Sequence, residues 1–563
     1  MKKKSLAIII AMMLILTLSV GCGKDSGKDK PAGGGDTPAG EGKADSEQYL
    51  NINLGSEPST LDASKGSDNY SSTVLNNVFE PLTRLEEDDD KNNTLEPAGA
   101  ESWDSNEDGT VWTFKIRDMK WSDGEKVTAA DYEYGIKRSI DQETASPYAF
   151  LLMPIKNAEK VNAGEMGLDE LGVKSLDEST LEITLETTTP YFLDLTYQRV
   201  MFPQRKDIIE ANGERYGSEP ETLVYNGPFT LTSWVHNSEL VLTKNDSYWD
   251  NETVQLQNVN LKIIQDENAG YNSLSNGSLD VAVANKPEWK DKFLKDEKLN
   301  HFEVINPQTF FMFFNTKDTV FKNANIRKAF SAAIDREDLA EVIFHGVNAP
   351  AYGWVPPSIS IDGKEYRDLG EDPVKTIMEE NKDAKALLVK GLEELGMDTD
   401  PSKLVVTISL GSTDQWFRTY GEYLQQTFIN TLGVDFKVEQ MEWPVFNSNV
   451  EKGEFQIGYM AWGADFNDPS SMLSLFKSDA GAIATGWENA RYDELIDLAS
   501  KEMDASKRLE YFKEAEQILI YEESPVAPVV YPKQNVFRYK YVNGLGITPF
   551  GTAGYKYGYT QGR

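Results

Sequence analysis

The repeated change between strand-like and helix-like segments limits this chain to a mixed α/β architecture. Apolar and polar residues alternate at 111–116, 181–185 and 405–410, which is the period of strands with one buried face. At 383–395 apolar residues instead recur every three to four positions, and Gly396 follows as a helix stop. Segments of both kinds along one chain pack as layered α/β or α+β lobes, so the fold class is predicted as α/β.

Local signals predict where further helices begin. Thr128 precedes a carboxylate at Asp131, and this spacing of an N-cap and an acidic third residue opens a helix that we expect to run through Ile140. Two more helices are predicted near 491–503 and 505–522.

Length and charge narrow the possibilities. The chain has 563 residues, and single cores stop growing at about 250–300 residues, so two or three lobes are expected. The net charge is −35. Nucleic acids and anionic lipids need a basic footprint, so we expect no nucleic-acid partner.

The first residues resemble a bacterial lipoprotein signal. A basic start at 2–4 and an apolar run at 5–20 lead into Cys22, the only cysteine of the chain. The run is too short for a comfortable membrane span. In such signals the peptide is cut before the cysteine, which then carries a diacylglyceryl group. One departure is Ser19, where leucine is commonest, while Leu18 stands one place further back.

The segment that follows the cysteine predicts a tether. Residues 23–44 are rich in Gly, Pro, Lys and Asp, and they carry too few apolar side chains to fold. As a flexible coil they would reach roughly 25 Å. We therefore predict a location on the extracytoplasmic face of the bacterial cell membrane, with the lipid as the only membrane contact.

Metal and cofactor chemistry find little support in the sequence. One cysteine allows no disulfide within the chain, and the histidines are scattered. Residues 104–115 begin like a calcium loop, with Asp104, Asn106 and Asp108 at alternate positions, but Lys115 takes the place of the bidentate glutamate. A hairpin turn is the better interpretation, and we expect no metal and no cofactor.

Two aspartates three positions apart raise the main question. Asp468 precedes Pro469 and a helical pattern, so an N-cap role is expected. Asp465 lies between Trp462 and Phe466 without a lysine or arginine nearby in sequence. A carboxylate in such surroundings is costly to desolvate unless a cation arrives. The alternative is a surface Asx-turn residue whose aromatic neighbours point inward.

A family resemblance begins within residues 98–138. WDSNEDGTVWTFKIR, WSDG and TAADY follow one another there, and they resemble the signature region of the extracytoplasmic solute-binding proteins of ABC importers, family 5. The oligopeptide-binding branch fits best. Further similar segments are TASPYA (144–149), YNGPFTLTSW (225–234), NDSYWD (245–250), NIRKAFSAAIDRE (325–337) and AEQILIYEESPVAPVVYP (515–532). The resemblance covers nearly all of the chain after residue 49.

The resemblance implies a two-lobed, hinged solute-binding fold of type II with an extra domain. Because the chain crosses between the lobes, the lobe that holds both ends of the folded part is discontinuous. The predicted parts are a signal peptide at 1–21, the lipidated Cys22 and linker at 22–48, lobe 1 at 49–83, 215–305 and 534–563, the extra domain at 84–214, and lobe 2 at 306–533.

The resemblance also implies the ligand site. The aspartate that matches Asp465 pairs with the α-ammonium group of a peptide. Tyr459 stands where enteric relatives carry an arginine that can meet the carboxylate of a short ligand, which leaves the C-terminal anchor open. The residues predicted to contact the ligand are Asp465, Trp462, Gly463, Phe466, Tyr148, Tyr459, Trp443 and Phe313.

The predicted function is that of a monomeric, lipid-anchored receptor that binds oligopeptides between its lobes and delivers them to an ABC permease with its ATPase subunits. Main-chain pairing would supply affinity without selecting a sequence, and no chemistry would be done on the ligand. A second hypothesis keeps the architecture with a sugar, a metal chelate or a signalling peptide as ligand. A surface hydrolase is the third hypothesis, although no nucleophile–base motif supports it.

Overall fold

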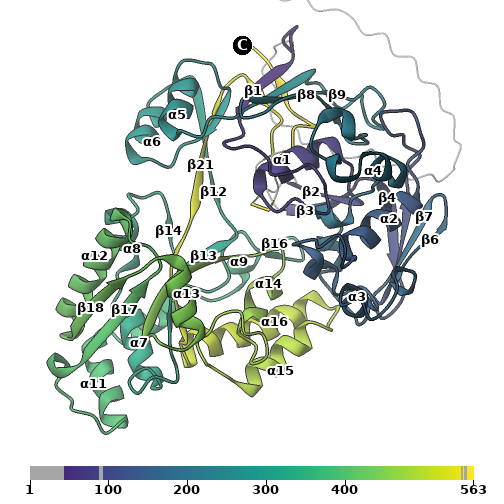
Figure 1. Ribbon diagram of the computed structural model, residues 1–563. Helices are drawn as coiled ribbons and strands as arrows, with labels where there is room; N and C mark the ends of the chain where they lie inside the picture. Colours follow the sequence, from purple (N-terminus) through teal and green to yellow (C-terminus); the bar gives the residue numbers. More distant parts are fainter. Residues whose placement is uncertain (1–43, 88–92, 547–548, 551–553) are drawn as a thin grey trace, which may run out of the picture. The chain divides into compact units, whose positions relative to one another are not determined.

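The computed structural model describes residues 44–87, 93–546, 549–550 and 554–563 (Figure 1). The predicted signal peptide, Cys22 and most of the linker lie outside the described residues. Within these ranges, strands form one sheet of seven, one of six and one of four, besides three two-stranded pairs. The limits of the predicted domains stay a prediction.

The seven-stranded sheet combines segments from both ends of the described chain. Its order is β12-β21-β11-β1-β10-β9-β8, with β1 parallel to β10 and β11 and the other pairs antiparallel. Its elements are β1 (Tyr49–Asn53), β8 (Phe229–Val235), β9 (Glu239–Lys244), β10 (Asn258–Lys262), β11 (Val281–Val283), β12 (Leu299–Ile305) and β21 (Lys533–Tyr539), with helices α1 (Asn69–Val78), α5 (Glu267–Ser275) and α6 (Pro287–Leu294).

The four-stranded sheet contains the hairpin predicted in place of a calcium loop. Its order is β4-β5-β7-β6. β4 pairs antiparallel with β5, and the amide of Thr110 closes the turn by donating to the side chains of Asn106 and Asp108 at 2.9 and 3.1 Å. The elements of this part are β4 (Ala100–Ser105), β5 (Val111–Ile116), β6 (Val173–Asp177), β7 (Thr180–Thr184), α2 (Ala129–Ile140), α3 (Ala158–Asn162) and α4 (Lys206–Asn212), with the pair β2 (Thr83–Glu87) and β3 (Asn93–Pro97).

The predicted helix start at Thr128 is confirmed. The Thr128 amide and hydroxyl both donate to the Asp131 carboxylate, at 2.8 and 3.1 Å. This side chain thereby satisfies groups that the first turn of α2 would leave without partners.

The six-stranded sheet carries helices on both faces. Its order is β14-β20-β13-β19-β17-β18. Its strands are β13 (Gln308–Phe314), β14 (Ala349–Pro350), β17 (Val405–Leu410), β18 (Asp435–Gln440), β19 (Ile457–Gly463) and β20 (Val526–Tyr531). The helices are α7 (Ala324–Ala332), α8 (Arg336–Val342), α9 (Tyr366–Leu369), α10 (Pro373–Glu380), α11 (Ala384–Glu394), α12 (Gln415–Leu432), α13 (Trp443–Glu451), α14 (Ser470–Leu473), α15 (Ala490–Ala499) and α16 (Ala505–Glu516).

Two helix predictions need adjustment. The helix expected at 491–503 is α15, which ends at Ala499, and Asp504 caps the next helix through the amides of Ser506 and Lys507. The helix expected at 505–522 is α16 followed by a π-helical turn, Gln517–Glu522.

A two-stranded ribbon connects the two large sheets. β12 pairs with β21 in the seven-stranded sheet, and their continuations β13 and β20 pair in the six-stranded sheet (Figure 1). Between the sheets the Asn306 amide donates to the Pro532 carbonyl at 2.8 Å. The chain therefore crosses twice at neighbouring points, which is the arrangement expected of a hinge.

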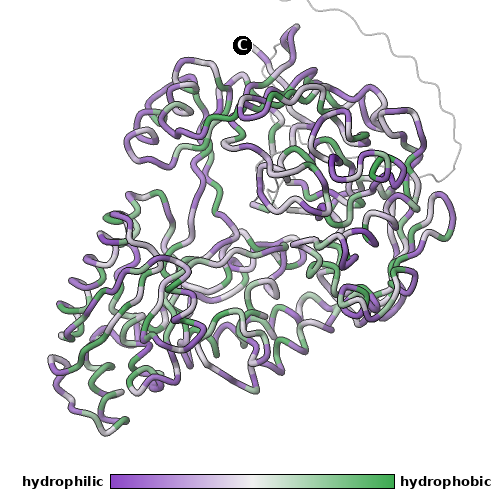
Figure 2. The backbone as a smooth tube through the Cα atoms, viewed as in Figure 1, coloured by the Kyte–Doolittle hydropathy of each residue, from purple (hydrophilic) through white to green (hydrophobic). Residues whose placement is uncertain are grey.

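The apolar side chains form separate cores. One core lies between the strands and helices of the seven- and four-stranded sheets, and a smaller one packs α5 and α6 against β12 and β21. Two others cover opposite faces of the six-stranded sheet. Figure 2 shows hydrophilic positions recurring along the helices and loops, with hydrophobic positions between them. This alternation places one face of each helix against a sheet.

Candidate functional site

The carboxyl ends of three strands meet at one edge of the six-stranded sheet. β17 lies parallel to β18 on one side and to β19 on the other. The chain runs from β17 to its neighbour β18 on one side and then to β19 on the other side of β17, so the direction in which strands are added reverses there. Open α/β sheets bind ligands at such a switch point. The segments that leave this edge are 411–414, 441–442 and 464–466, and the last of them contains Asp465.

The main chain around Asp465 is held from three directions. The Ala464 amide donates to the carbonyl of Pro307 in the connecting ribbon at 2.7 Å. The Asp465 amide donates to the Ser471 hydroxyl at 2.9 Å, and the Gln198 side-chain amide donates to the Asp465 carbonyl at 3.4 Å. These contacts fix the backbone and leave the carboxylate available.

The Asp465 side chain is more exposed than its apolar neighbours predict. In the described part of the chain, no lysine or arginine forms an ion pair with it, and no hydrogen bond reaches its carboxylate oxygens. The alternative interpretation, a surface Asx-turn residue, agrees with this exposure, but no Asx-turn hydrogen bond to the carboxylate forms among the described residues. Surrounding protein atoms raise the pKa of Asp465 above its usual value through desolvation. Water reaches the group, and this exposure limits the effect.

The aromatic neighbours of Asp465 pack on opposite sides. Phe466 stacks on Tyr191, with ring centroids 4.6 Å apart and an interplanar angle of 14°. Trp462 packs against one core of the six-stranded sheet, and Gly463 ends β19 opposite Gln308. The predicted contacts Trp462, Gly463 and Phe466 thus lie beside Asp465.

Tyr459 and Phe313, two of the predicted ligand contacts, are buried in this structure. Tyr459 is 2% exposed and packs on Tyr420 at 4.5 Å, because residues three apart on β19 face opposite sides of the sheet. Phe313 is fully buried against Phe455 at 5.1 Å. Neither side chain offers a surface to a ligand in this structure.

Trp443 lies at the same edge as Asp465. It opens α13 and is 52% exposed. A Cβ at Gly411 would lie 2.8 Å from the Trp443 ring, so this close approach requires glycine. The position of Trp443 is compatible with its predicted role.

Tyr148 lies in the part of the chain around the four-stranded sheet. It is half-buried, and the Arg199 guanidinium carbon lies 4.3 Å from its ring centroid. Gln198 directly precedes Arg199 and donates to the Asp465 carbonyl. The segment that packs on Tyr148 therefore contacts the main chain of the candidate site.

Asp468 has a partner that the sequence does not show. Its carboxylate accepts from the Ser470 amide at 2.9 Å, as a helix-capping side chain would, although α14 begins only at Ser470. It also accepts two hydrogen bonds from Arg508, each 2.9 Å long. Both side chains are buried, so this pair is part of the core.

Sequence reasoning missed Tyr191, Gln198 and Arg508. These residues lie 40 to 275 positions from the segment that they contact, and no motif connects them with it. A glutamine or tyrosine has no local signal that distinguishes a distant contact from an ordinary surface position.

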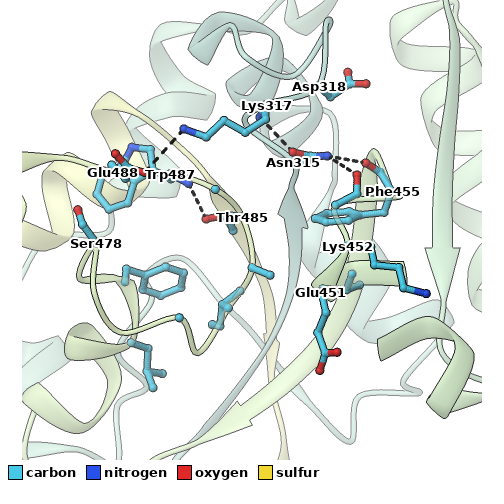
Figure 3. A pocket seen from close by; sticks show the side chains of 18 of the residues that line it. Asn315, Lys317, Asp318, Glu451, Lys452, Phe455, Ser478, Thr485, Trp487 and Glu488 are labelled. Carbon is cyan, nitrogen blue, oxygen red and sulfur yellow. Dashed lines mark hydrogen bonds and ion pairs between the residues drawn. The ribbon is translucent and has the colours of Figure 1, made fainter. Parts of the chain in front are cut away.

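A pocket of about 730 Å³ lies elsewhere on the same lobe. Figure 3 shows Asn315, Lys317, Lys452 and Glu488 around it. The Lys317 ammonium lies 3.9 Å from the Glu488 carboxylate, so one of the cations around the pocket already faces an acid. None of the predicted ligand contacts lines this pocket, and we therefore assign the candidate site to the strand edge at Asp465.

The described residues contain neither a membrane-spanning helix nor a cluster of metal ligands. No helix among them combines the length and apolar character needed to span a bilayer. No group of three or more histidine, cysteine, aspartate or glutamate side chains in the same ranges could hold a metal ion.

The fold and the site define a class of protein. Residues 94–483 match the model for bacterial extracellular solute-binding proteins, family 5. This match spans more than half of the chain, and the protein belongs to that family.

Particular relatives extend the similarity over almost the whole chain. The dipeptide-binding protein DppE of Bacillus subtilis is 35% identical over 511 residues, which is 90% of this chain and 91% of that protein. The oligopeptide-binding protein OppA of the same organism is 35% identical over 531 residues, 93% of each chain.

Solved structures confirm the predicted two-lobed fold of type II. The murein tripeptide-binding protein MppA in its unliganded open form matches with a TM-score of 0.80 and 27% identity, over 93% of this chain and 99% of that one. Listeria monocytogenes OppA bound to peptide matches with a TM-score of 0.67 and 29% identity, over 92% and 99%.

Proposed function

We propose that this protein binds peptides by their free amino terminus and passes them to an ABC importer. The observation that carries this proposal is the carboxylate of Asp465, which stands at the switch-point edge of an α/β sheet and has no ion-pair partner among the described residues. Relatives named for dipeptide and oligopeptide binding support the same ligand class.

An ammonium group is the natural partner of this carboxylate. Every unmodified peptide carries one at a fixed place, so pairing with it selects peptides without selecting their side chains. A neutral sugar offers no cation to Asp465, which makes the sugar hypothesis less suitable. A charge-assisted hydrogen bond of this kind is about twice as strong as a neutral one.

The rest of the ligand would be held through its backbone. An extended peptide presents N–H and C=O groups along both edges, and strands or loops on either side can pair with them. Bridging waters can fill the space left by small side chains at little cost. Broad acceptance of peptide sequences is the expected result.

The remaining parts of the proposal concern location and partners. We infer a diacylglyceryl anchor at Cys22, a monomer, and transfer to a permease with its ATPase subunits without chemical change of the ligand. The name of the family, extracellular solute-binding proteins, agrees with action outside the cytoplasm. The hydrolase hypothesis is less suitable, because the hydrogen bonds of His236 and His301 run to Glu57, Glu219 and Asn535, and among the described residues none runs from these rings to a serine, threonine or cysteine nucleophile.

The test compares peptide binding by the wild type, Asp465→Asn and Asp118→Asn in calorimetry. Asp118 is exposed and gives a control with the same change in charge. We expect Asp465→Asn to weaken binding of a free-amine tetrapeptide about 10- to 100-fold. The control should bind like the wild type.

N-terminal acetylation of the peptide should cause a comparable loss in the wild type. It should cause little further loss in Asp465→Asn. Equal affinity of the wild type for free and acetylated peptides would contradict the role of Asp465.

A further inference from the structure

Arg199 is a half-buried cation without a carboxylate partner. Among the described residues, none forms an ion pair with it, and its side chain hydrogen-bonds to the Ser72 hydroxyl through Nη1 and to Tyr148. Its Nε–H is buried without a hydrogen-bond partner, as are those of Arg84 and Arg367, but these two arginines pair with Glu80 and Glu516. An unsatisfied buried donor on a charged group is costly and needs an explanation.

Other buried arginines of this protein show what full satisfaction looks like. Arg336 donates to the backbone carbonyls of Pro528, Ser331 and Ile334. Arg508 forms its two-bonded pair with Asp468. Arg199 has neither a set of carbonyls nor a carboxylate, so its guanidinium retains binding capacity.

The nearest acid does not neutralise Arg199. Asp68 acts on it only through space, while its carboxylate accepts hydrogen bonds from the Ser71 amide and hydroxyl at 2.7 and 2.8 Å. Burial lowers the pKa of Arg199, and Tyr148 and Asp68 oppose that shift. The guanidinium nevertheless stays charged near neutral pH.

The surroundings of Arg199 connect it with the candidate ligand site. It lies over the ring of Tyr148, a predicted ligand contact, at 4.3 Å. The preceding residue, Gln198, contacts the Asp465 carbonyl, and neighbouring Cα atoms are about 3.8 Å apart. Arg199 and Tyr148 therefore belong to the part of the chain that contacts the main chain of the candidate site.

We propose that Arg199, supported by the ring of Tyr148, binds a carboxylate of the peptide and sets a preference for one charge pattern. This inference rests on the proposed peptide-binding function. It names a carboxylate anchor that Tyr459 cannot supply, since Tyr459 is enclosed in the core. A planar guanidinium suits a carboxylate because two parallel N–H groups can donate to its two oxygens.

The overall charge of the protein makes this cation important. At −35 the chain as a whole disfavours an acidic guest. A local, partly desolvated arginine can reverse that preference at one position, because charges interact more strongly away from water. The carboxylate can come from the C-terminus of a short peptide or from an acidic side chain near the amino terminus.

Two peptide series distinguish these sources. The first compares di-, tri- and tetra-alanine as free acids and as C-terminal amides. The second compares Glu with Gln at each of the first three positions of an alanine hexapeptide. Calorimetry is done on the wild type, Arg199→Gln, Arg199→Lys and the exposed control Arg215→Gln, with thermal unfolding as a check of the fold.

In one of the two series we expect one pair of peptides in which the carboxylate form binds about tenfold more tightly than its neutral counterpart. This ratio should be the same in the wild type and the control. Arg199→Gln should abolish this ratio, and Arg199→Lys should restore part of it. A loss of packing alone would weaken both members of a pair equally and leave the ratio unchanged.

Two results would overturn the inference. One is a wild type that never distinguishes a carboxylate from its amide, and the other is a preference that survives in Arg199→Gln. Tetra-alanine amide has a free amino terminus and no carboxylate, so its binding tests the proposed peptide-binding function separately from the carboxylate contact with Arg199. If the wild type does not bind it or any other peptide, the proposed function fails as well.

Discussion

Asp465 and Asp468 are separated by three residues and differ in almost every physical respect. Asp468 is 3% exposed and forms two hydrogen bonds with the buried Arg508. Asp465 is exposed, and within the described residues no cation pairs with it. One carboxylate is satisfied by the protein itself, and the other is the one that we propose to bind the ligand.

The difference shows how the protein combines a rigid loop with an available charge. Asp468 and Arg508 join α14 to α16, while the amides of Ala464 and Asp465 bind Pro307 and Ser471. The backbone around the site is thereby fixed before a ligand arrives. Preorganisation of this kind lowers the entropic cost of binding.

The largest effect on stability is expected from Asp468→Asn. Removing one charge leaves Arg508 buried without its partner, which typically costs about 3–5 kcal/mol of the free energy of unfolding. Urea unfolding of the wild type and the variant measures this loss. A change below about 1 kcal/mol would mean that the pair is not a structural element of the loop.

The next change replaces Asp194, which lies close enough to Asp468 and Arg508 to sense both charges. Desolvation first, and then Asp468, raise the pKa of Asp194 well above its ordinary value of 3.8, while Arg508 opposes them. A raised pKa means that the folded state prefers the protonated acid. This contribution to stability is complete below the ordinary value and is lost as the pH rises through the raised one.

Asp194→Asn should therefore stabilise the protein at neutral pH, since asparagine mimics the neutral acid. We expect a gain smaller than the Asp468 loss, because Arg508 keeps its partner. The difference between variant and wild type should shrink as the pH falls toward 3.8. A variant that is less stable than the wild type at pH 7 would contradict the direction of this shift.

The sequence predicted local features well and distant contacts poorly. The strands at 111–116 and 405–410, and the helix start at Thr128, depend on nearby residues and were confirmed. Tyr459 was assigned to the site by its place in a motif. The strand turns it into the core, and only the three-dimensional register shows this.

The two aspartates illustrate the same limit. The hydrogen bond from the Ser470 amide to Asp468 lies within two residues, although the N-cap of α14 is Pro469 and not Asp468 as the sequence predicted. Its ion pair with Arg508 spans 40 residues of chain, and no pattern announces it. For Asp465 the sequence could show the lack of a nearby cation, but not how far water reaches the carboxylate.

A smaller effect is expected from the stacked pair of Tyr191 and Phe466. A double-mutant cycle with Tyr191→Leu and Phe466→Leu should give a coupling energy of about 0.5–1.5 kcal/mol in the free energy of unfolding. Phe466→Tyr keeps the ring and serves as the matched control. Additive effects of the two leucine variants would show that the rings do not support each other in solution.

The smallest effect on stability is expected from Asp465→Asn, although the same change should weaken peptide binding most. Exposed substitutions outside structural networks usually change the free energy of unfolding by less than about 0.5 kcal/mol. Because the pKa of Asp465 is raised, any change near neutral pH should favour the variant. Urea unfolding without peptide, beside that of Asp468→Asn, provides the measurement. A loss as large as that of Asp468→Asn would place Asp465 in the same structural network, and the contrast between the two carboxylates would disappear.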